Sequence, residues 1–384
     1  MRRRYFLFGA LNAVVAARPS RAAARTKVVV ALFDGFGPDY LERSDMPVLR
    51  RIAQTKIVEG MIPSVTNVNN ASLATGCFPD EHGITTNFYY DPATGTAEEM
   101  KSPRFLLRPT ILEKAKQRGW KTAIVSSKDK VRTLCSRGAD IAVSAEKPEA
   151  PWLAAAGPQE SMYSAAVNYW SLRAARHALK HDGVDLLYLS TTDYMMHTYA
   201  PEEAPSLEHL HTLDRMLGEI FDDHPKLEFY LTADHGMNAK TEALDPIRLL
   251  RAEGIAAAAA PIISDTHKVH HQDLGGTYYI YLEKPSEAER AMMVLRVAPE
   301  VEEVYPRAEA ARRFRLLAGR IGDVLILARK QSVFGELDQL RKPVRVRTHG
   351  SRHEASVPVL VHGRKVNLAQ YRYNFDLTRR LELS

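Results

Sequence analysis

Residues 227–236 read Leu-Glu-Phe-Tyr-Leu-Thr-Ala-Asp-His-Gly, a largely apolar run that leads within two residues to an aspartate, a histidine and a glycine. Continuous apolar runs are typical of strands buried on both faces of a parallel sheet. Four further runs share this pattern, at Lys27–Phe33, Ile57–Met61, Thr122–Val125 and Val184–Ser190. Helical patterns alternate with them, as at 110–117, 162–179 and 207–221. The alternation predicts a doubly wound α/β fold with a mostly parallel sheet.

The pattern changes between about residues 278 and 331. Short strand and helix patterns follow one another there, at Tyr278–Leu282, Pro285–Val297, Val301–Tyr305, Ala308–Leu317 and Asp323–Ala328. They predict a small α+β insertion, or cap, at 278–331. The main domain resumes with the apolar run Pro358–His362, so that residues 25–384 form one catalytic domain with an insertion.

Composition excludes several classes of protein. The chain has 384 residues, of which 45% are hydrophobic and 26% charged, as in globular proteins and unlike disordered, collagen-like or coiled-coil chains. Two cysteines, Cys77 and Cys135, exclude a disulfide framework and a Cys-rich zinc cluster, and their pairing is left open. The net charge of +6 invites a nucleic-acid partner, but no helix-turn-helix, Cys/His finger or basic stripe with aromatics supports one.

The first 24 residues have the features of an export signal. They begin Met-Arg-Arg-Arg-Tyr-Phe-Leu-Phe, continue with an apolar stretch to Ala17 and end in small residues. Arg3-Arg4-x-Phe6-Leu7 resembles a twin-arginine signal. We expect a periplasmic or secreted protein, or a cytoplasmic one if this interpretation is wrong. The stretch is too short for stable membrane insertion, and its removal would lower the formal charge from +6 to +1.

Polar residues follow the ends of the predicted strands, where α/β sheets bind their ligands. Asp34 follows the first run, Asp193 and His197 the fourth, and Asp234 and His235 the fifth. A sixth ligand comes late in the chain, at His349 or His353. Three aspartates and three histidines suit Zn²⁺ or a similar divalent ion. Six ligands exceed the need of one tetrahedral ion, so the sequence predicts two ions about 3.5–4 Å apart, as in phosphoryl displacement.

A nucleophile is expected in the polar segment Ser64–Asn70 after the second run. The hydroxyl of Thr66 is the leading candidate, with Ser64 and Ser72 as competitors. Such a hydroxyl is inert at neutral pH unless a metal stabilises its alkoxide. A helix predicted at Asn70–Thr75 would direct N–H groups at phosphoryl oxygens.

In this order and spacing the fragments resemble the alkaline phosphatase superfamily, in its type I phosphodiesterase/nucleotide pyrophosphatase branch. Within that branch the chain is most similar to the phosphonoacetate hydrolases. The resemblance covers essentially the whole chain after Thr26 and implies a three-layer αβα sandwich. The similar stretches are Pro63–Asn70, Thr75-Gly76, His82-Gly83-Ile84, Asn87–Asp91, Lys128-Asp129-Lys130, Thr192–Pro201, Thr232–Lys240 and Val269–His271.

The resemblance implies a role for each matched residue. One zinc would be held by Asp34, Thr66, Asp234 and His235, and the other by Asp193, His197 and His349; Mn²⁺ or Co²⁺ could substitute. Thr66 would be the nucleophile and Asn87 a donor to phosphoryl oxygens. Lys128 and Lys130 would hold the substrate carboxylate. The implied reaction is hydrolysis of phosphonoacetate to acetate and phosphate through a phosphothreonine intermediate.

One feature departs from the resemblance. Phosphonoacetate hydrolases mostly act inside the cell, so an export signal leaves open an exported phosphodiesterase or nucleotide pyrophosphatase. In that alternative Phe88, Tyr89 and Tyr90 could stack a base. The predicted partner is a small anionic phosphonate or phosphate ester in either reading. The oligomeric state is left open, a dimer included.

Overall fold

The computed structural model describes residues 25–264 and 270–383, so the predicted export signal lies outside the described residues. Within them, the central sheet has seven strands in the order β2-β16-β8-β1-β7-β5-β6. The strands are β1 (Val28–Leu32), β2 (Gln54–Glu59), β5 (Thr122–Ser126), β6 (Ile141–Ser144), β7 (Leu186–Ser190), β8 (Glu228–Thr232) and β16 (Ser356–His362). Only β16 runs against the others. The predicted mostly parallel sheet is confirmed.

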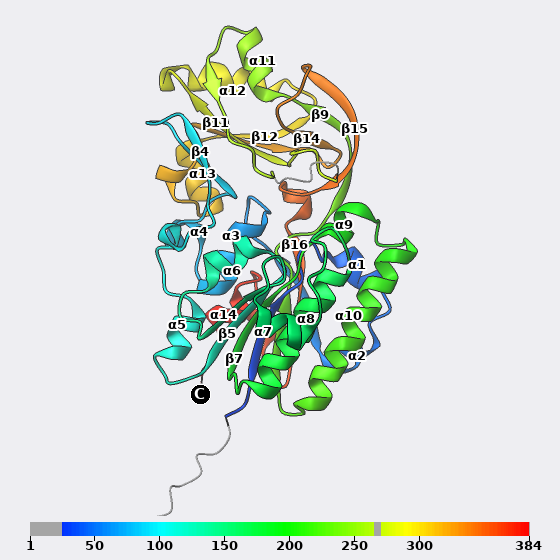
Figure 1. The fold of residues 1–384 in the computed structure, drawn as a ribbon. Helices are drawn as coiled ribbons and strands as arrows, with labels where there is room; N and C mark the ends of the chain where they lie inside the picture. The colour runs from blue at the N-terminus through cyan, green and yellow to red at the C-terminus, as the bar shows by residue number, and fades with distance from the viewer. Residues whose placement is uncertain (1–24, 265–269, 384) are drawn as a thin grey trace, which may run out of the picture.

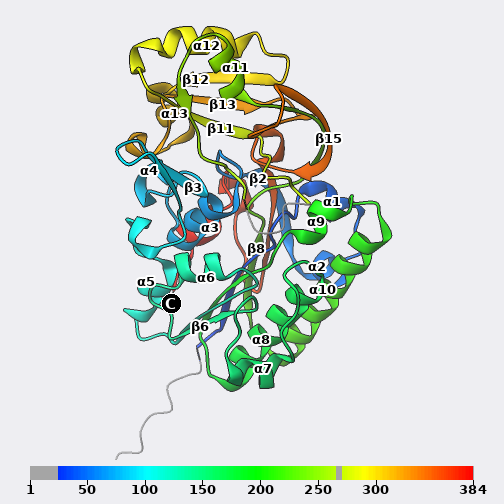
Figure 2. The same ribbon diagram turned by 45° about the horizontal axis from the view of Figure 1, so that its top comes forward.

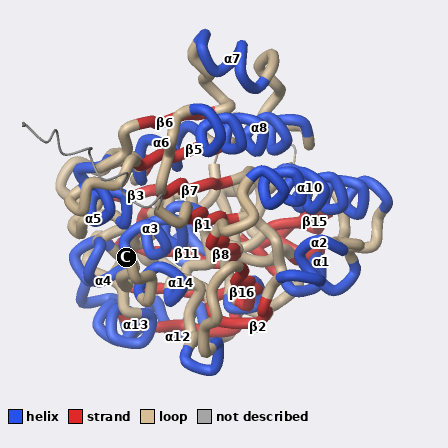
Figure 3. Tube along the Cα trace, turned by 90° about the horizontal axis from the view of Figure 1, so that it is seen from below, coloured by secondary structure: helices blue, strands red, loops and turns tan. Residues whose placement is uncertain are grey.

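Helices cover both faces of the sheet and complete three layers (Figure 3). One face carries α1 (Pro38–Arg43), α2 (Pro47–Ile52), α8 (Ala166–His181) and α10 (Ala204–Asp223). The other carries α3 (Thr66–Thr75), α5 (Ile111–Lys116), α6 (Asp129–Cys135) and α14 (Asp376–Arg379). β1, β7 and β8 lie in the middle, and side chains such as Leu32, Leu189 and Leu231 are fully buried. Continuous apolar runs form these strands because each face is covered.

A cap lies over one end of the sandwich (Figures 1 and 2). The chain enters it after β8 and leaves it before β16. It contains a four-stranded sheet, β10-β11-β13-β12, and a three-stranded sheet, β14-β9-β15. The elements are β9 (Asn238–Leu244), α11 (Pro246–Ala252), β10 (Ala257–Ala258), β11 (Thr277–Leu282), α12 (Ala288–Arg296), β12 (Val301–Pro306), α13 (Arg307–Phe314), β13 (Val324–Ala328), β14 (Ser332–Phe334) and β15 (Arg341–Thr348). The predicted insertion at 278–331 falls inside this larger segment.

Shorter elements complete the fold around the end of the sandwich that faces the cap. They are α4 (Pro79–His82), β3 (Phe88–Asp91), β4 (Thr96–Glu99) and α9 (Tyr194–Thr198), whereas α7 (Ala150–Ala156) packs on α8 away from the cap (Figure 2). Among the described residues no helix has the length and apolar character needed to cross a membrane.

Two local predictions differ from the structure. The second apolar run forms β2 at Gln54–Glu59, three residues earlier than expected, and it is an exposed edge strand instead of a buried one. Ile57 in it is 45% exposed. The helix after it begins at Thr66, four residues before the predicted start at Asn70. It ends at Thr75 and is followed by Gly76, whose φ of +71° only glycine adopts readily. The candidate nucleophile is therefore the first residue of α3.

Candidate active site

Four of the predicted ligands lie where neighbouring parallel strands end. Asp34 follows β1, Asp193 follows β7, and Asp234 with His235 follows β8. β1 pairs with β7 on one side and β8 on the other, so these three ends are adjacent at one edge of the sheet. Each of the four side chains is at most 5% exposed. The topology thus gathers residues separated by 200 positions into one buried cluster.

Gly35 permits the close approach of these strand ends. Its φ is +72°, and a Cβ atom at this position would lie 3.0 Å from the Cβ of Asp193. Its backbone N–H donates to Asp234 Oδ1 over 3.1 Å. The Asp-Gly pair after the first strand therefore does more than turn the chain, because it brings three carboxylates together.

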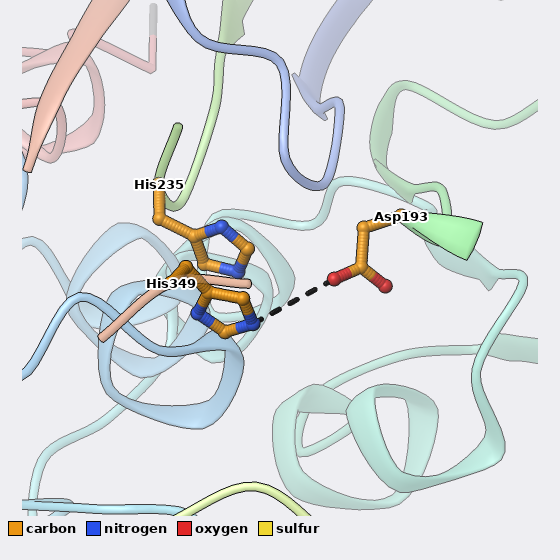
Figure 4. Close-up of side chains that lie close together, drawn as sticks. All are labelled: Asp193, His235 and His349. Carbon is orange, nitrogen blue, oxygen red and sulfur yellow. Dashed lines mark ion pairs between the residues drawn. The ribbon is translucent and has the colours of Figure 1, made fainter. Parts of the chain in front are cut away.

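The ligand atoms form two adjoining groups. In subsite A (Asp34, Asp234, His235), His235 Nε2 lies 3.4 Å from Asp34 Oδ1 and 3.5 Å from Asp234 Oδ2. In subsite B (Asp193, His197, His349), Asp193 Oδ2 lies 3.0 Å from His197 Nε2 and 3.8 Å from His349 Nε2. Ligand atoms of Asp193, His235 and His349 also lie within 4.8 Å of one another, so the subsites adjoin (Figure 4).

Backbone carbonyls orient all three imidazoles. His197 Nδ1 contacts Arg347 O at 2.6 Å, His235 Nδ1 contacts Gly236 O at 3.0 Å, and His349 Nδ1 contacts Ser64 O at 2.8 Å. A carbonyl oxygen only accepts, so each Nδ1 carries the proton and each Nε2 presents its lone pair to the cluster. Metal-binding histidines are commonly held in this way through their second nitrogen.

Subsite A also passes a chemical test of fit. Among the described residues, Asp34 Oδ1, Asp234 Oδ2 and His235 Nε2 are buried atoms without a hydrogen-bond partner. Leaving such an atom unsatisfied costs about 1–3 kcal/mol, and these three converge. A divalent cation bound by two carboxylates and an imidazole would satisfy all three at once, and this donor set suits Zn²⁺.

The electrostatics of the cluster favour a bound cation. Burial raises the pKa of Asp34 well above its ordinary value, and the charges of Asp193 and Asp234 raise it further. Burial likewise raises the pKa of Asp234 to about 6. Burial opposes ionisation of Asp193 too, but the charge of Lys128 holds its pKa well below the ordinary value. Because these carboxylates repel one another in a dry site, added positive charge would stabilise their ionised forms.

A cavity of about 340 Å³ opens onto the cluster and brings in the remaining candidates. Thr66 and Asn87 line it together with Asp193, His197 and His349. Thr66 is 2% exposed and occupies the N-terminus of α3. Asn87 Oδ1 accepts from the backbone N–H of Asn67 over 2.9 Å, so its Nδ2 is the atom that remains to donate.

Both predicted lysines line the same cavity. Lys128 Nζ lies between the subsites, 2.6 Å from Asp34 Oδ2 and 2.7 Å from Asp193 Oδ1. Despite its burial, these carboxylates raise the pKa of Lys128 above its ordinary value. Lys130 Nζ lies 3.8 Å from Glu99 Oε1, and its pKa is lowered by burial and by Lys128. The cavity thus joins a hydroxyl, two lysines and the ligands of subsite B in one space.

The competing candidates have other partners. His353 is on the surface and pairs with Glu302, whereas His349 is 2% exposed and points into subsite B. The Ser64 hydroxyl donates to Ser351 O, and the Ser72 hydroxyl contacts His82 Nε2 at 2.8 Å. Neither serine lines the cavity.

The aromatic residues expected to stack a base pack elsewhere. Within the described residues, the cavity lining does not include Phe88, Tyr89 or Tyr90. The ring of Tyr90 packs against Tyr281 and that of Tyr89 against Phe105. Instead, Tyr163 and Tyr194 line the cavity, with His270 and His271.

Sequence reasoning missed a further residue of the site. Asn168, on α8, is 1% exposed. Its Oδ1 accepts from the Ser127 hydroxyl and the Thr192 N–H, and its Nδ2 donates to Thr192 O. It therefore joins the loop before Lys128 to the loop before Asp193. No spacing connects it to either loop, so only the fold reveals it.

Known proteins are similar to this chain in sequence and in fold. The family described as type I phosphodiesterase / nucleotide pyrophosphatase matches residues 28–352. Ectonucleotide pyrophosphatase/phosphodiesterase family member 1 of Homo sapiens is 27% identical over 221 residues, which are 53% of this chain and 23% of that protein. The chain spans about a fifth to a quarter of the length of the first curated relatives.

Two solved structures illustrate the range of likeness. Phosphonoacetate hydrolase from Sinorhizobium meliloti 1021, in complex with phosphonoacetate, is 31% identical with a TM-score of 0.83, covering 93% of this chain and 95% of that one. Murine ectonucleotide pyrophosphatase/phosphodiesterase 5 in complex with AMP is 17% identical with a TM-score of 0.64, covering 88% of each chain, and shows the fold alone. The chain belongs to the type I phosphodiesterase/nucleotide pyrophosphatase family.

Proposed function

We propose that this enzyme hydrolyses the C–P bond of phosphonoacetate to give acetate and phosphate. The supporting observation is the shared cavity, which Lys128 and Lys130 line together with Thr66 and the ligands of subsite B, while Lys128 also contacts Asp34 of subsite A. Phosphonoacetate carries a phosphonate and a carboxylate. A site with ligand groups for cations and two ammonium groups, of which that of Lys128 also contacts Asp34 and Asp193, is complementary to both charges.

One zinc ion would be held by subsite A with Thr66 and another by subsite B, and Mn²⁺ or Co²⁺ could take their place. When bound, these ions would supply Lewis acidity that favours the Thr66 alkoxide and neutralises the phosphonate charge. The chain itself contributes the orientation. The N-terminus of α3 directs backbone N–H groups and the positive end of its dipole towards the phosphoryl group. The Asn87 amide would donate to a phosphoryl oxygen.

The bond changes follow from these positions. Thr66 Oγ attacks phosphorus in line, and the Oγ–P bond forms as the P–C bond breaks. The electron pair of that bond delocalises from the CH₂ carbon into the neighbouring carboxylate, whose charge Lys128 and Lys130 stabilise. A water molecule takes the proton that Thr66 Oγ loses and delivers a proton to the carbon, which gives acetate. A second water hydrolyses phosphothreonine, which restores the Thr66 hydroxyl and releases phosphate.

Cleavage of phosphodiesters or nucleotides is the alternative, because the family includes such enzymes. Tyr163 and Tyr194 are the observation in its favour, since aromatic rings in the cavity could contact a base. We also propose that the N-terminal 24 residues direct export, which would suit that alternative. Cys77 and Cys135 are free thiols in this structure.

A comparison of three substrates decides between the two reactions. The zinc-loaded enzyme is assayed for kcat/KM with phosphonoacetate, bis(4-nitrophenyl) phosphate and ATP. The proposal requires phosphonoacetate to rank first. A higher kcat/KM for the diester or for ATP would replace it with the phosphodiesterase or pyrophosphatase assignment.

A further inference from the structure

Lys240 and Glu354 form a buried ion pair beside the metal-ligand loops. Both side chains are 1% exposed, and Lys240 Nζ lies 2.8 Å from Glu354 Oε1. Lys240 Nζ also donates to Lys330 O over 2.9 Å, at the turn between β13 and β14. Burial opposes ionisation of Glu354, but Lys240 and further donors hold its pKa below the ordinary value. The carboxyl group of Glu354 is therefore ionised in the folded protein.

Glu354 is fully engaged by groups from both sides of the site. Its Oε1 also accepts from Asn238 Nδ2 over 2.7 Å, and its Oε2 accepts from the N–H and hydroxyl of Ser351. Its backbone carbonyl accepts from Gly236 N over 2.7 Å. These contacts connect residues 236–240, which follow the ligands of subsite A, with residues 351–354, which follow His349.

Each member of the pair lies the same number of residues after a histidine of one subsite. Lys240 comes five residues after His235, and Glu354 comes five residues after His349. Between them β9 and β15 pair so that Asn238 lies opposite Thr348. A shift of one loop along the other would therefore break the ion pair and this register together, and would move His349 relative to His235.

The cost of burying two charges argues that the pair positions the two loops, and does not only stabilise the fold. Replacing a buried ion pair by apolar side chains of similar size is often neutral or stabilising, so stability alone does not account for it. A charged pair with four further hydrogen bonds does hold two loops in one relative position. Two-metal chemistry needs such precision, because the ions lie only about 3.5–4 Å apart.

We propose that Lys240 and Glu354 are a positioning pair that sets the separation of subsites A and B by locking the loop after His235 to the loop after His349. The inference rests on the proposed dimetal centre. It does not depend on which phosphorus compound is cleaved, and so metal binding can test it without a substrate.

The test compares metal binding by the wild-type enzyme, the double variant Lys240→Met/Glu354→Gln and the control Glu300→Gln. Glu300 is 3% exposed and pairs with Arg341 in the cap, so the control neutralises an equally buried carboxylate away from the subsites. Zinc per chain is measured across buffered free Zn²⁺, and the Co²⁺-loaded forms are compared by electronic absorption. Circular dichroism and thermal unfolding establish that each variant folds.

The wild type and the control should bind two ions per chain. The double variant should fold, bind the second ion about 10–100-fold more weakly and show an altered Co²⁺ spectrum. Two ions of wild-type affinity with an unchanged spectrum would overturn the proposal. If the double variant does not fold, Glu354→Asp decides: it keeps the charge but shortens the side chain, and normal binding of both ions by it would equally overturn the proposal.

The outcomes separate this inference from the proposed function. A wild type that binds two ions but leaves phosphonoacetate intact would contradict the proposed reaction and leave the positioning pair to be judged by the variants. A wild type that binds fewer than two ions would contradict the positioning pair and the dimetal centre together.

Discussion

The imidazole rings of His235 and His349 stack face to face, with centroids 3.4 Å apart and planes 9° apart (Figure 4). One ring belongs to subsite A and the other to subsite B, so the two subsites are in contact through their histidines. Burial lowers the pKa of both rings, and they stack as neutral imidazoles suited to bind a cation. A displacement of either loop would consequently alter both subsites.

Thr66→Ala should abolish turnover, because no other hydroxyl of the α3 segment lines the cavity in the described residues. Zinc content and the unfolding temperature should change little. Thr75→Ala, on the last turn of the same helix, is the matched control and should remain active, since the Thr75 hydroxyl donates to Ala71 O away from the cavity. Retained activity in Thr66→Ala, measured as phosphate release, would refute the nucleophile assignment.

Lys130→Met should lower kcat/KM for phosphonoacetate sharply and that for a nitrophenyl phosphodiester little. Loss of a charged partner for the substrate carboxylate costs about 2–5 kcal/mol, which is at least a 30-fold effect. Lys130 is a cleaner test than Lys128, which also contacts Asp34 and Asp193. Lys116→Met removes a surface ion pair with Asp140 and should leave both activities unchanged. Equal losses for both substrates would show that Lys130 does not recognise the carboxylate.

His349→Ala and His353→Ala should differ in metal content. His349 points into subsite B, so its loss should reduce bound zinc from two ions to about one per chain and abolish activity. His353 is paired with Glu302 at the surface, and its loss should leave both metal content and activity intact. Metal analysis of the dialysed proteins measures the difference. Loss of an ion in His353→Ala alone would reverse the assignment.

His82 should make the fold sensitive to acid. It is fully buried, its Nδ1 accepts from the Ile84 N–H, and burial lowers its pKa to about 3. The unfolded chain binds this proton near pH 6.5 and the folded chain does not, so the free energy of unfolding falls as the pH is lowered from 6.5 towards 3, by up to about 1.4 kcal/mol per pH unit. Above pH 6.5 the histidine contributes no pH dependence.

The variant His82→Gln isolates this contribution. Glutamine can still accept from Ile84 and donate to Ser72, but it does not titrate. The difference in unfolding free energy between wild type and variant should therefore shrink on acidification, as urea unfolding at pH 7, 6, 5 and 4 would measure. A constant difference would show that His82 is protonated at the same pH in both states.

The strands that surround the site were predictable because their burial on both faces leaves continuous apolar runs. β1, β5, β7 and β8 lie within one or two residues of the runs that predict them. The edge strand β2 was placed less well, because most of its residues are exposed and the apolar run that predicts it continues past its end to Met61. The reversed direction of β16 also leaves no mark in its composition.

The same contrast holds within the site. Asp34, Asp193 and Asp234 stand at strand ends, which sequence periodicity locates. The groups that orient the histidines cannot be located in this way. His349 donates to Ser64 O, 285 residues away in the sequence, and His197 donates to Arg347 O, 150 residues away. Backbone carbonyls carry no sequence signature, so these contacts, like those of Asn168, required the fold.

Cleavage of the C–P bond is the central claim, and product analysis tests it most directly. Phosphonoacetate is incubated with the zinc-loaded enzyme and followed by ¹H and ³¹P NMR. The account predicts acetate and phosphate in equal amounts, none with Thr66→Ala, and a loss of rate on chelation of the metal. A zinc-loaded enzyme that cleaves phosphodiesters while leaving phosphonoacetate intact would contradict it.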